Sequence, residues 1–544
     1  MVYCQSENAS SERAKALSSM ADFYFTAGNY DKAIELEKQA MNMTGVLYGN
    51  RSFDYSSLAL TIAKYYYSKG RFDLSSSESV KEQSLSEAIK NLRITMDVIK
   101  DSMLVNYDKI DSKEKYELWQ QVCPLFDRLF PGYVAYYQTD STTSELYNVV
   151  LFSKGITWRN YEEAQKADWR EVQRKLKSDE IAIEFISLVD LDEENIQFYA
   201  LTLKKECKAP HMIKLFDIQQ LHDVFKTTPI DERDLEMGKL IWGTLKNDLK
   251  GVKNIYFSAT HFLHQFPIEF LPIDDNYYYF DFYNFYRLSS TISLVSDRKR
   301  YHYNRAVLYG GLDYESQELS NGKSTPKTRA GVEPLDNSKP EIDEISELLK
   351  NNGVQCDVYS GLSGTERTLR NLSGQSFDIL HLSTHGKYVT FADSLKYISE
   401  DDVLLNSYIT LSGANMRLKD TSINVKDDGI VSAYDISRMV FKTLDLVCLS
   451  VCESALGVYS DDDGMIGLQK GFKLAGANTI IMSLDEVDDE ATKNFMVEFY
   501  KNLMNGKTKH QSFVDAQKSL RQIENGKFNK PKYWASFIML DGLN

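Results

Sequence analysis

Short apolar runs alternate with amphipathic segments in the part of the chain that begins near residue 301. The apolar runs predict strands over 306–314, 354–361, 377–386, 444–454 and 477–484. The amphipathic segments predict helices over 340–353, 365–375, 434–441, 464–476 and 489–506. This alternation is typical of a mostly parallel sheet covered by helices on both faces. In such a sheet the functional crevice lies at the carboxyl ends of the strands.

The first hundred residues show a helical pattern instead, with two segments, 20–41 and 62–77, that align with each other. Gly28 of the first segment matches Gly70 of the second, and alanines and aromatic residues match around them. Small residues that admit a neighbouring helix, with aromatic residues between the helices, are typical of tetratricopeptide repeats. We interpret the polar stretch 75–84 as a loop or an insertion inside the second repeat. An ordinary helical bundle is the alternative.

These changes in the pattern of apolar and polar residues predict three domains. A helical repeat region covers 1–145, an upstream half with strands and turns covers 146–300, and an α/β domain covers 301–544. The fold class is therefore a multidomain chain with N-terminal α-helical tetratricopeptide-type repeats followed by α/β structure around a mostly parallel sheet. A chain of this length is too long for one ordinary core.

The net charge of -15 argues against a general binder of nucleic acid or of anionic membranes, because both need a basic face. The first twenty residues lack the apolar core of a signal peptide, and no run of 18 apolar residues occurs. We expect a cytoplasmic protein with no membrane partner and no direct nucleic-acid partner.

The six cysteines are scattered, and no CxxC pair occurs; they are Cys4, Cys123, Cys207, Cys356, Cys448 and Cys452. Neither a zinc site nor a disulfide framework is indicated. A glycine loop that could hold a phosphate is absent from the GLDYESQELSNG stretch. We therefore expect no cofactor and no metal.

Two of the apolar runs stop abruptly at residues with reactive side chains. The run in 378–389 ends before His385, and the run in 445–457 ends before Cys452. If both strands belong to one sheet, they bring an imidazole and a thiol to the same edge, where the histidine can accept the thiol proton. The backbone N–H groups of Gly386 and Cys452 could then hold an oxyanion. Cys448 and His381, inside the runs, are expected to be buried and structural.

The motifs of the chain from about residue 146 resemble those of CHAT-domain proteins, the caspase-like cysteine peptidases associated with tetratricopeptide repeats. HLSTHG, DDGIVSAYDIS, LVCLSVCESALG, GLQKGFKLAGANTIIMSL and KYWASFIMLDG occur in the order of that family. The resemblance implies a caspase-like fold, with His385 as general base and Cys452 as nucleophile of peptide-bond hydrolysis. It also implies that residues 146–300 are an inactive caspase-like half. Ser454 and Ala455 depart from the usual Thr-Gly after Cys-Glu.

The resemblance also suggests a specificity pocket. The strand that ends near residue 484 forms one wall of the pocket in caspase-like folds, and Asp485 stands here where the family commonly has tryptophan. With Glu486, Asp488 and Glu453 it could bind a basic side chain on the acyl side of the cut. The alternative is that these acids, foremost Asp488 and Asp489 and then Asp485, cap the helix that begins near residue 489 and interact with its positive end.

The favoured function is a regulated cysteine endopeptidase acting on protein substrates. The repeats would bind a regulatory protein partner, and the polar region from about 387 to 430 would be a movable loop. The resemblance to the family also suggests a role in bacterial defence or cell death. The alternative is a catalytically silent scaffold that binds protein partners, but both His385-Gly386 and Cys452-Glu453 are intact.

Overall fold

The computed structural model describes residues 10–106, 109, 112–156, 167–189, 195–296, 302–315, 331–388, 400–419, 427–451, 457–460 and 464–543. The chain divides into two compact units, Met1–Glu171 with Ser187–Gln220 and Val172–Ile186 with Leu221–Asn544. It passes from one unit to the other within α10 (Trp169–Lys175), β1 (Glu180–Val189) and α11 (Ile218–Thr227). The boundaries 145/146 and 300/301 that the sequence suggests stay predictions.

The first unit consists mainly of helices. They are α2 (Ser11–Thr26), α3 (Tyr30–Tyr48), α4 (Phe53–Phe72), α5 (Glu78–Asn106), α6 (Ser112–Pro124), α7 (Phe130–Tyr136) and α8 (Asp140–Ser153), with a π-helical turn over Leu125–Leu129. The strands β2 (Ile196–Lys204) and β3 (His211–Asp217) pair antiparallel. The helices α2, α3 and α4 begin after Ser10, Asn29 and Ser52, whose side chains each accept a hydrogen bond from a backbone N–H of the first turn.

The two N-terminal helix pairs, α2–α3 and α4–α5, have the tetratricopeptide-type arrangement that the sequence predicts, and α3 packs on α4. Ala21 is fully buried at the first helix pair, where Tyr65 of α4 packs against it. The Tyr65 hydroxyl donates a hydrogen bond of 2.6 Å to Asp22. Small residues thus admit the neighbouring helix, and aromatic residues fill the space between helices.

The two aligned glycines have different roles. Gly28 follows the end of α2 with φ +78, a backbone conformation that favours glycine. Gly70 lies inside α4, where a Cβ would meet Leu85 Cγ at 2.8 Å. The polar stretch 75–84 is not a loop throughout, because α5 begins at Glu78. That part of the sequence interpretation is wrong.

The second unit is built on a large sheet. Its strands are β4 (Asn254–Ser258), β5 (Asn284–Arg287), β6 (Arg305–Leu312), β7 (Gln355–Gly361), β8 (Ile379–Ser383), β12 (Leu446–Ser450), β15 (Thr479–Ser483) and β16 (Phe537–Leu540), together with β1. They lie in the order β1-β4-β5-β16-β15-β12-β8-β6-β7. Neighbours run parallel except β15 and β16, which run antiparallel. The mostly parallel sheet is confirmed.

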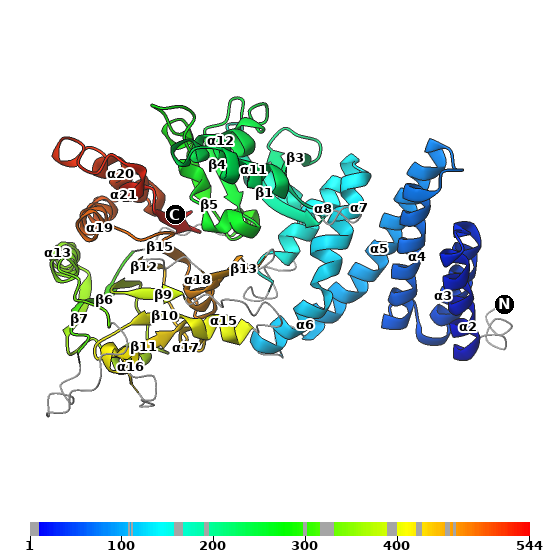
Figure 1. The fold of residues 1–544 in the computed structure, drawn as a ribbon. Helices are drawn as coiled ribbons and strands as arrows, with labels where there is room; N and C mark the ends of the chain where they lie inside the picture. The colour runs from blue at the N-terminus through cyan, green and yellow to red at the C-terminus, as the bar shows by residue number, and fades with distance from the viewer. Residues whose placement is uncertain are drawn as a thin grey trace. The chain divides into compact units, whose positions relative to one another are not determined.

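Helices cover this sheet, since every residue of β8, β12 and β15 is buried. The further helices of the unit are α12 (Arg233–Gly238), α13 (Ser338–Asn351), α14 (Glu366–Arg370), α15 (Glu400–Asn406), α16 (Ala414–Lys419), α17 (Ala433–Ser437), α18 (Leu468–Leu474), α19 (Asp489–Met504), α20 (Lys509–Leu520) and α21 (Pro531–Trp534). Within this unit, α13 packs against α19, and the two lie next to each other beside the sheet in Figure 1.

Two segments of the second unit differ from the elements expected. The region 387–430 was expected to be a movable loop, but β9 (Gly386–Tyr388), β10 (Ser407–Thr410) and β11 (Ile430–Ser432) form a small antiparallel sheet there. Residues 389–399 and 420–426 lie outside the described residues. The helix expected from residue 464 begins only at Leu468, because β14 (Gly464–Gly467) pairs with β13 (Gly457–Ser460). Among the described residues, none of the helices combines the length and the hydropathy of a membrane span.

We expect Gly70→Ala to destabilise the first unit by about 1–3 kcal/mol, because the added methyl group overlaps Leu85 and the chain must shift to admit it. The measurement is urea unfolding of the full chain followed by circular dichroism. Ser57→Ala, at an exposed position of the same helix, is the control and should change the unfolding free energy by no more than about 0.5 kcal/mol. An unchanged midpoint for Gly70→Ala would contradict the close approach of α5 to α4.

Candidate active site

The edge of the large sheet where β8, β12 and β15 end is the candidate active site. β8 and β12 are parallel neighbours, and their last residues, Ser383 and Ser450, are register partners. His385 follows β8 by two positions, and position 452 follows β12 by two positions. Neighbouring strands lie about 4.8 Å apart. The pairing therefore places the ends of β8 and β12 side by side at one edge of the sheet, and the place of Cys452 beyond that edge stays a prediction.

Cys452 and Glu453 themselves lie outside the described residues, which stop at Val451 and resume at Gly457. The end of β12 is held from both neighbouring strands. On the side of β15, the Ser483 hydroxyl donates a hydrogen bond of 2.6 Å to the Val451 carbonyl. The backbone N–H of Thr384 donates to the carbonyl of Ser450 at 3.3 Å.

The imidazole of His385 is half-buried and oriented by a backbone carbonyl. Its Nε2 lies 2.6 Å from the carbonyl oxygen of Glu333. A carbonyl oxygen can only accept, so Nε2 carries the proton of the neutral ring, and Nδ1 has the lone pair that can act as a base. The ring of Tyr314 packs beside the imidazole at 5.3 Å between centroids. Burial raises the pKa of Tyr314 to about 12, so its hydroxyl stays protonated.

Gly386 begins β9, and its geometry bears on the expected oxyanion site. The backbone N–H of Thr410 in β10 donates to the His385 carbonyl at 2.9 Å, and Gly386 is the register partner of Ile409. Hydrogen-bonded pairs alternate with non-hydrogen-bonded pairs along an antiparallel ladder. The N–H of Gly386 is therefore directed away from β10.

The acidic residues after β15 divide into two kinds. Asp485 follows Ser483, the end of β15, by two positions, and both Asp485 and Glu486 are exposed. The Asp488 carboxylate instead caps α19, accepting a hydrogen bond of 2.9 Å from the Ala491 N–H. The capping alternative thus describes Asp488, whereas Asp485 and Glu486 remain available at the sheet edge.

A buried carboxylate that the sequence interpretation did not include joins β8 to β12. Glu341 of α13 is fully buried, and its Oε2 accepts hydrogen bonds of 3.2 Å from both Ser383 and Ser450. Its Oε1 lies 2.8 Å from His381 Nε2. A signal for Glu341 exists in the sequence, because it lies on the same helix stripe as the buried Ile342, Ile345 and Leu349.

The residues inside the two strands are structural, as expected. His381 is fully buried, and the Tyr500 hydroxyl of α19 lies 3.4 Å from its Nδ1. The same hydroxyl donates to Cys448 Sγ at 3.3 Å. Burial raises the pKa of the Cys448 thiol to about 12, which keeps it protonated and unreactive.

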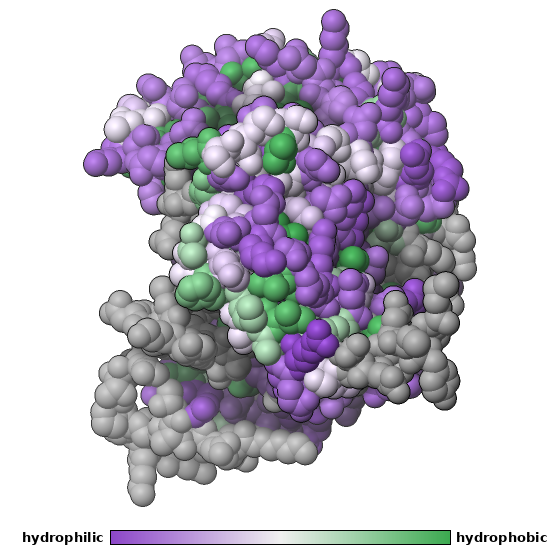
Figure 2. Space-filling model, turned by 90° about the vertical axis from the view of Figure 1, so that its right-hand side faces the viewer, coloured by the Kyte–Doolittle hydropathy of each residue, from purple (hydrophilic) through white to green (hydrophobic). Residues whose placement is uncertain are grey.

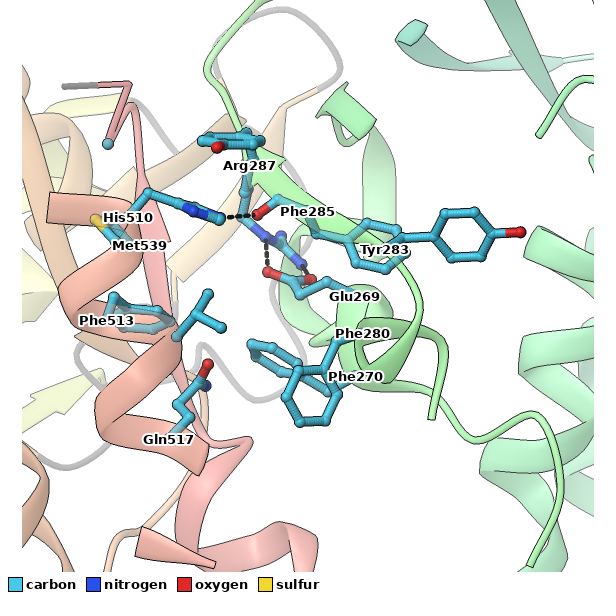
Figure 3. A pocket seen from close by; sticks show the side chains of 13 residues that line it. Glu269, Phe270, Phe280, Tyr283, Phe285, Arg287, His510, Phe513, Gln517 and Met539 are labelled. Atoms are coloured by element: carbon cyan, nitrogen blue, oxygen red, sulfur yellow. Dashed lines mark hydrogen bonds and ion pairs between the residues drawn. The ribbon is translucent and has the colours of Figure 1, made fainter. Parts of the chain in front are cut away.

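A separate cavity lies where β5 meets β16, and Figure 3 shows its lining. Phe270, Phe280 and Phe513 supply aromatic surface. Beside them the guanidinium of Arg287 binds both carboxylate oxygens of Glu269, at 2.9 and 2.6 Å. The residues that line this cavity include neither cysteine nor serine. It therefore lacks the thiol that a cysteine peptidase needs.

His510 lines the same cavity and is also structural. It donates from Nε2 to the Phe285 carbonyl at 2.8 Å, and burial lowers its pKa to about 4. Within the described ranges, no group of three or more histidine, cysteine, aspartate or glutamate side chains is arranged to hold a metal ion.

A model of a known protein family matches the sequence of this chain directly. The family model for the CHAT domain matches residues 218–542, more than half of the chain. This chain belongs to the CHAT-domain family. The match covers the sheet edge with His385, the strand β12 that precedes Cys452, and the loop with Asp485.

Curated relatives and solved structures also resemble this CHAT-domain chain. The mouse protein "Tetratricopeptide repeat protein 28" is 32% identical over 219 residues, or 38% of this chain. The human protein of the same name is 33% identical over 78 residues, or 14% of this chain. The matched stretches make up 8% and 3% of the lengths of these relatives.

Two solved structures are similar at low identity. The Arg-specific cysteine proteinase gingipain R matches with 8% identity and a TM-score of 0.33, over 59% of this chain and 69% of its own. The Saccharomyces cerevisiae separase–securin complex matches with 10% identity and a TM-score of 0.42, over 97% of this chain and 46% of its own. Matches of this degree say nothing about substrate or activity.

We expect Glu341→Ala to destabilise the second unit by about 3–5 kcal/mol, because it leaves His381 and two serine hydroxyls unpaired in the core. Glu341→Gln keeps an acceptor and should cost less. Urea unfolding measures both. The control is Glu344→Ala on the same helix, which removes only a half-exposed ion pair with Lys493 and should cost less than about 1 kcal/mol. Equal losses for the Glu341 and Glu344 variants would contradict the structural role of the carboxylate.

Proposed function

We propose that this CHAT-domain protein is a cysteine endopeptidase in which Cys452 is the nucleophile and His385 the general base. The observation that carries the proposal is the parallel register of β8 and β12, which pairs Ser383 with Ser450 two positions before each of these residues. The free Nδ1 of His385, with Nε2 bound to the Glu333 carbonyl, supports the role of a base.

The proposed reaction has two stages. Nδ1 of His385 takes the proton of the Cys452 thiol, and the thiolate attacks the carbonyl carbon of the scissile peptide bond. The N–H groups of Gly386 and Cys452 donate to the oxyanion that forms. The imidazolium then gives its proton to the leaving amine as the C–N bond breaks, which leaves a thioester. A water molecule, deprotonated by His385, attacks the thioester and releases the acid and the thiol.

We propose that a basic side chain occupies the position on the acyl side of the cut. Asp485 and Glu486 are exposed at the end of β15, the neighbour of β12 on the side opposite to β8. A carboxylate there can pair with the guanidinium of arginine or the ammonium of lysine. Glu453 is part of the same proposal, and Asp488 contributes only negative charge because its carboxylate caps α19.

Regulation through the first unit is the remaining part of the proposal. This unit exposes several large apolar side chains, among them Phe23, Phe53 and Phe72 on helices and Leu74 in the turn after α4. Figure 2 shows small groups of hydrophobic residues on a mostly hydrophilic surface. Exposed aromatic and aliphatic side chains on helical repeats suit the binding of a protein partner. A role in bacterial defence or cell death stays a prediction of the family resemblance.

We expect Cys452→Ala and His385→Ala each to lower kcat/KM for peptide hydrolysis by at least about a thousandfold, because the two groups act as a unit. The assay is hydrolysis of a fluorogenic peptide library by the full chain. Cys207→Ala, which changes a partly buried cysteine of the first unit, is the control and should leave the rate unchanged. Hydrolysis that survives in Cys452→Ala contradicts the proposal, and a wild-type chain without hydrolysis favours the silent scaffold.

We expect the same library to show cleavage after arginine or lysine. Asp485→Asn should lower kcat/KM for such substrates by about tenfold or more, because the ion pair with the substrate is lost. Asp488→Asn is the matched control, since its side chain is engaged with α19 and it should change kcat/KM far less. Cleavage only after leucine, methionine or aspartate would overturn the proposed specificity.

A further inference from the structure

A short segment of backbone, residues 331–337, governs the orientation of His385. The carbonyl of Glu333 in the middle of this segment is the partner of His385 Nε2, at 2.6 Å. The position of that carbonyl therefore decides which ring nitrogen has the lone pair and where this nitrogen points.

One side chain holds the beginning of the segment from both sides. Asn415 of α16 accepts a hydrogen bond of 2.7 Å from the Val332 N–H and donates one of 3.0 Å to the Val332 carbonyl. A primary amide can do both at once because it has an oxygen acceptor and an NH₂ donor. The Asn415 side chain thus acts on Val332 as a neighbouring strand would, one residue before Glu333.

Asn415 is itself fixed. It is 3% exposed, and its backbone N–H donates to the Tyr314 carbonyl at 2.9 Å. The ring of Tyr314 packs against His385. Gly331 fits tightly against the amide, since a Cβ at this position would lie 2.3 Å from Asn415 Oδ1.

The far end of the segment is anchored separately. The Asp489 carboxylate accepts hydrogen bonds from the Asn337 N–H at 2.8 Å and from its Nδ2 at 3.1 Å. The Glu333 carbonyl therefore lies between two fixed points, and Asn415 is the nearer one.

We propose that Asn415 is a positioning residue for His385, acting through the backbone of Val332 and Glu333. This proposal rests on the proposed peptidase function. Without Asn415 the Glu333 carbonyl moves, and the His385 imidazole that it binds rotates and changes tautomer. Nδ1 of His385 then faces the Cys452 thiol for only part of the time. The loss falls on the chemical step rather than on substrate binding.

The test is alkylation of Cys452 in the full chain by iodoacetamide at pH 7, followed by mass spectrometry, with Cys207 in the same sample as internal reference. Asn415→Ala should slow the labelling of Cys452 about tenfold, because a thiol without its base is mostly protonated at this pH. In peptide hydrolysis it should lower kcat by about tenfold and change KM by no more than about twofold. Gly331→Ala, which displaces the amide without altering it, should have the same effects.

Two further variants separate positioning from stability. Glu315→Ala removes the third partner of the Asn415 amide, a hydrogen bond of 2.8 Å, together with the ion pair to Lys419, and should leave labelling unchanged. In a His385→Ala background, Asn415→Ala should change the labelling rate by less than about twofold, since it acts only through the imidazole.

Each outcome is decisive. If His385→Ala leaves Cys452 labelling unchanged, the proposed function itself is wrong. If His385→Ala slows labelling but Asn415→Ala and Gly331→Ala do not, only the role of Asn415 is wrong. A loss that persists in the His385→Ala background, or that occurs only together with loss of the cooperative thermal transition, also contradicts that role.

Discussion

The carboxylate of Glu341 is the interaction on which the candidate site depends. A buried carboxylate is costly unless hydrogen bonds satisfy it, and the Glu341 carboxylate has its full set of partners when β8 and β12 end side by side. The two serines that it joins are register partners, so a slip of β12 against β8 would separate Ser450 from the carboxylate. The buried carboxylate thus favours the register that places the ends of β8 and β12 at one edge of the sheet.

The site combines this rigid edge with irregular backbone beside it. The strand β8 leads directly to His385, but the backbone segment 331–337 orients the imidazole. Gly386 belongs to the small antiparallel sheet β11-β10-β9. Reactive groups on loops that a rigid scaffold positions are common in α/β proteins. Here the scaffold also carries the orienting groups, since α16 supplies Asn415 and α19 supplies Asp489.

Much of the second unit could be predicted, because buried parallel strands and amphipathic helices leave strong local patterns. The rule that such strands end at one edge of the sheet predicts the shared edge of β8 and β12, whereas their direct pairing is seen only in the structure. Segments whose structure depends on distant partners were missed. Residues 464–467 look helical next to 468–474 but form a strand because 457–460 pairs with them.

The contacts around His385 and the role of Glu341 were missed for a similar reason. Glu333 meets His385 across 52 positions of the chain, and Val332 meets Asn415 across 83. No local pattern encodes such contacts. In the first unit, Gly28 and Gly70 align in sequence, yet one ends a helix and the other admits Leu85, a difference that only packing reveals.

The place of β16 in the large sheet has a consequence for the order of folding. This strand, residues 537–540, lies between β5 and β15, and Asp541 after it binds Ser289 at 2.8 Å. During synthesis β5 and β15 emerge from the ribosome before β16, and they cannot join into one sheet without the strand that lies between them. The sheet therefore remains in two pieces until residues 537–540 have been translated, and a ribosome that stalls before residue 537 leaves two open strand edges for chaperones to protect.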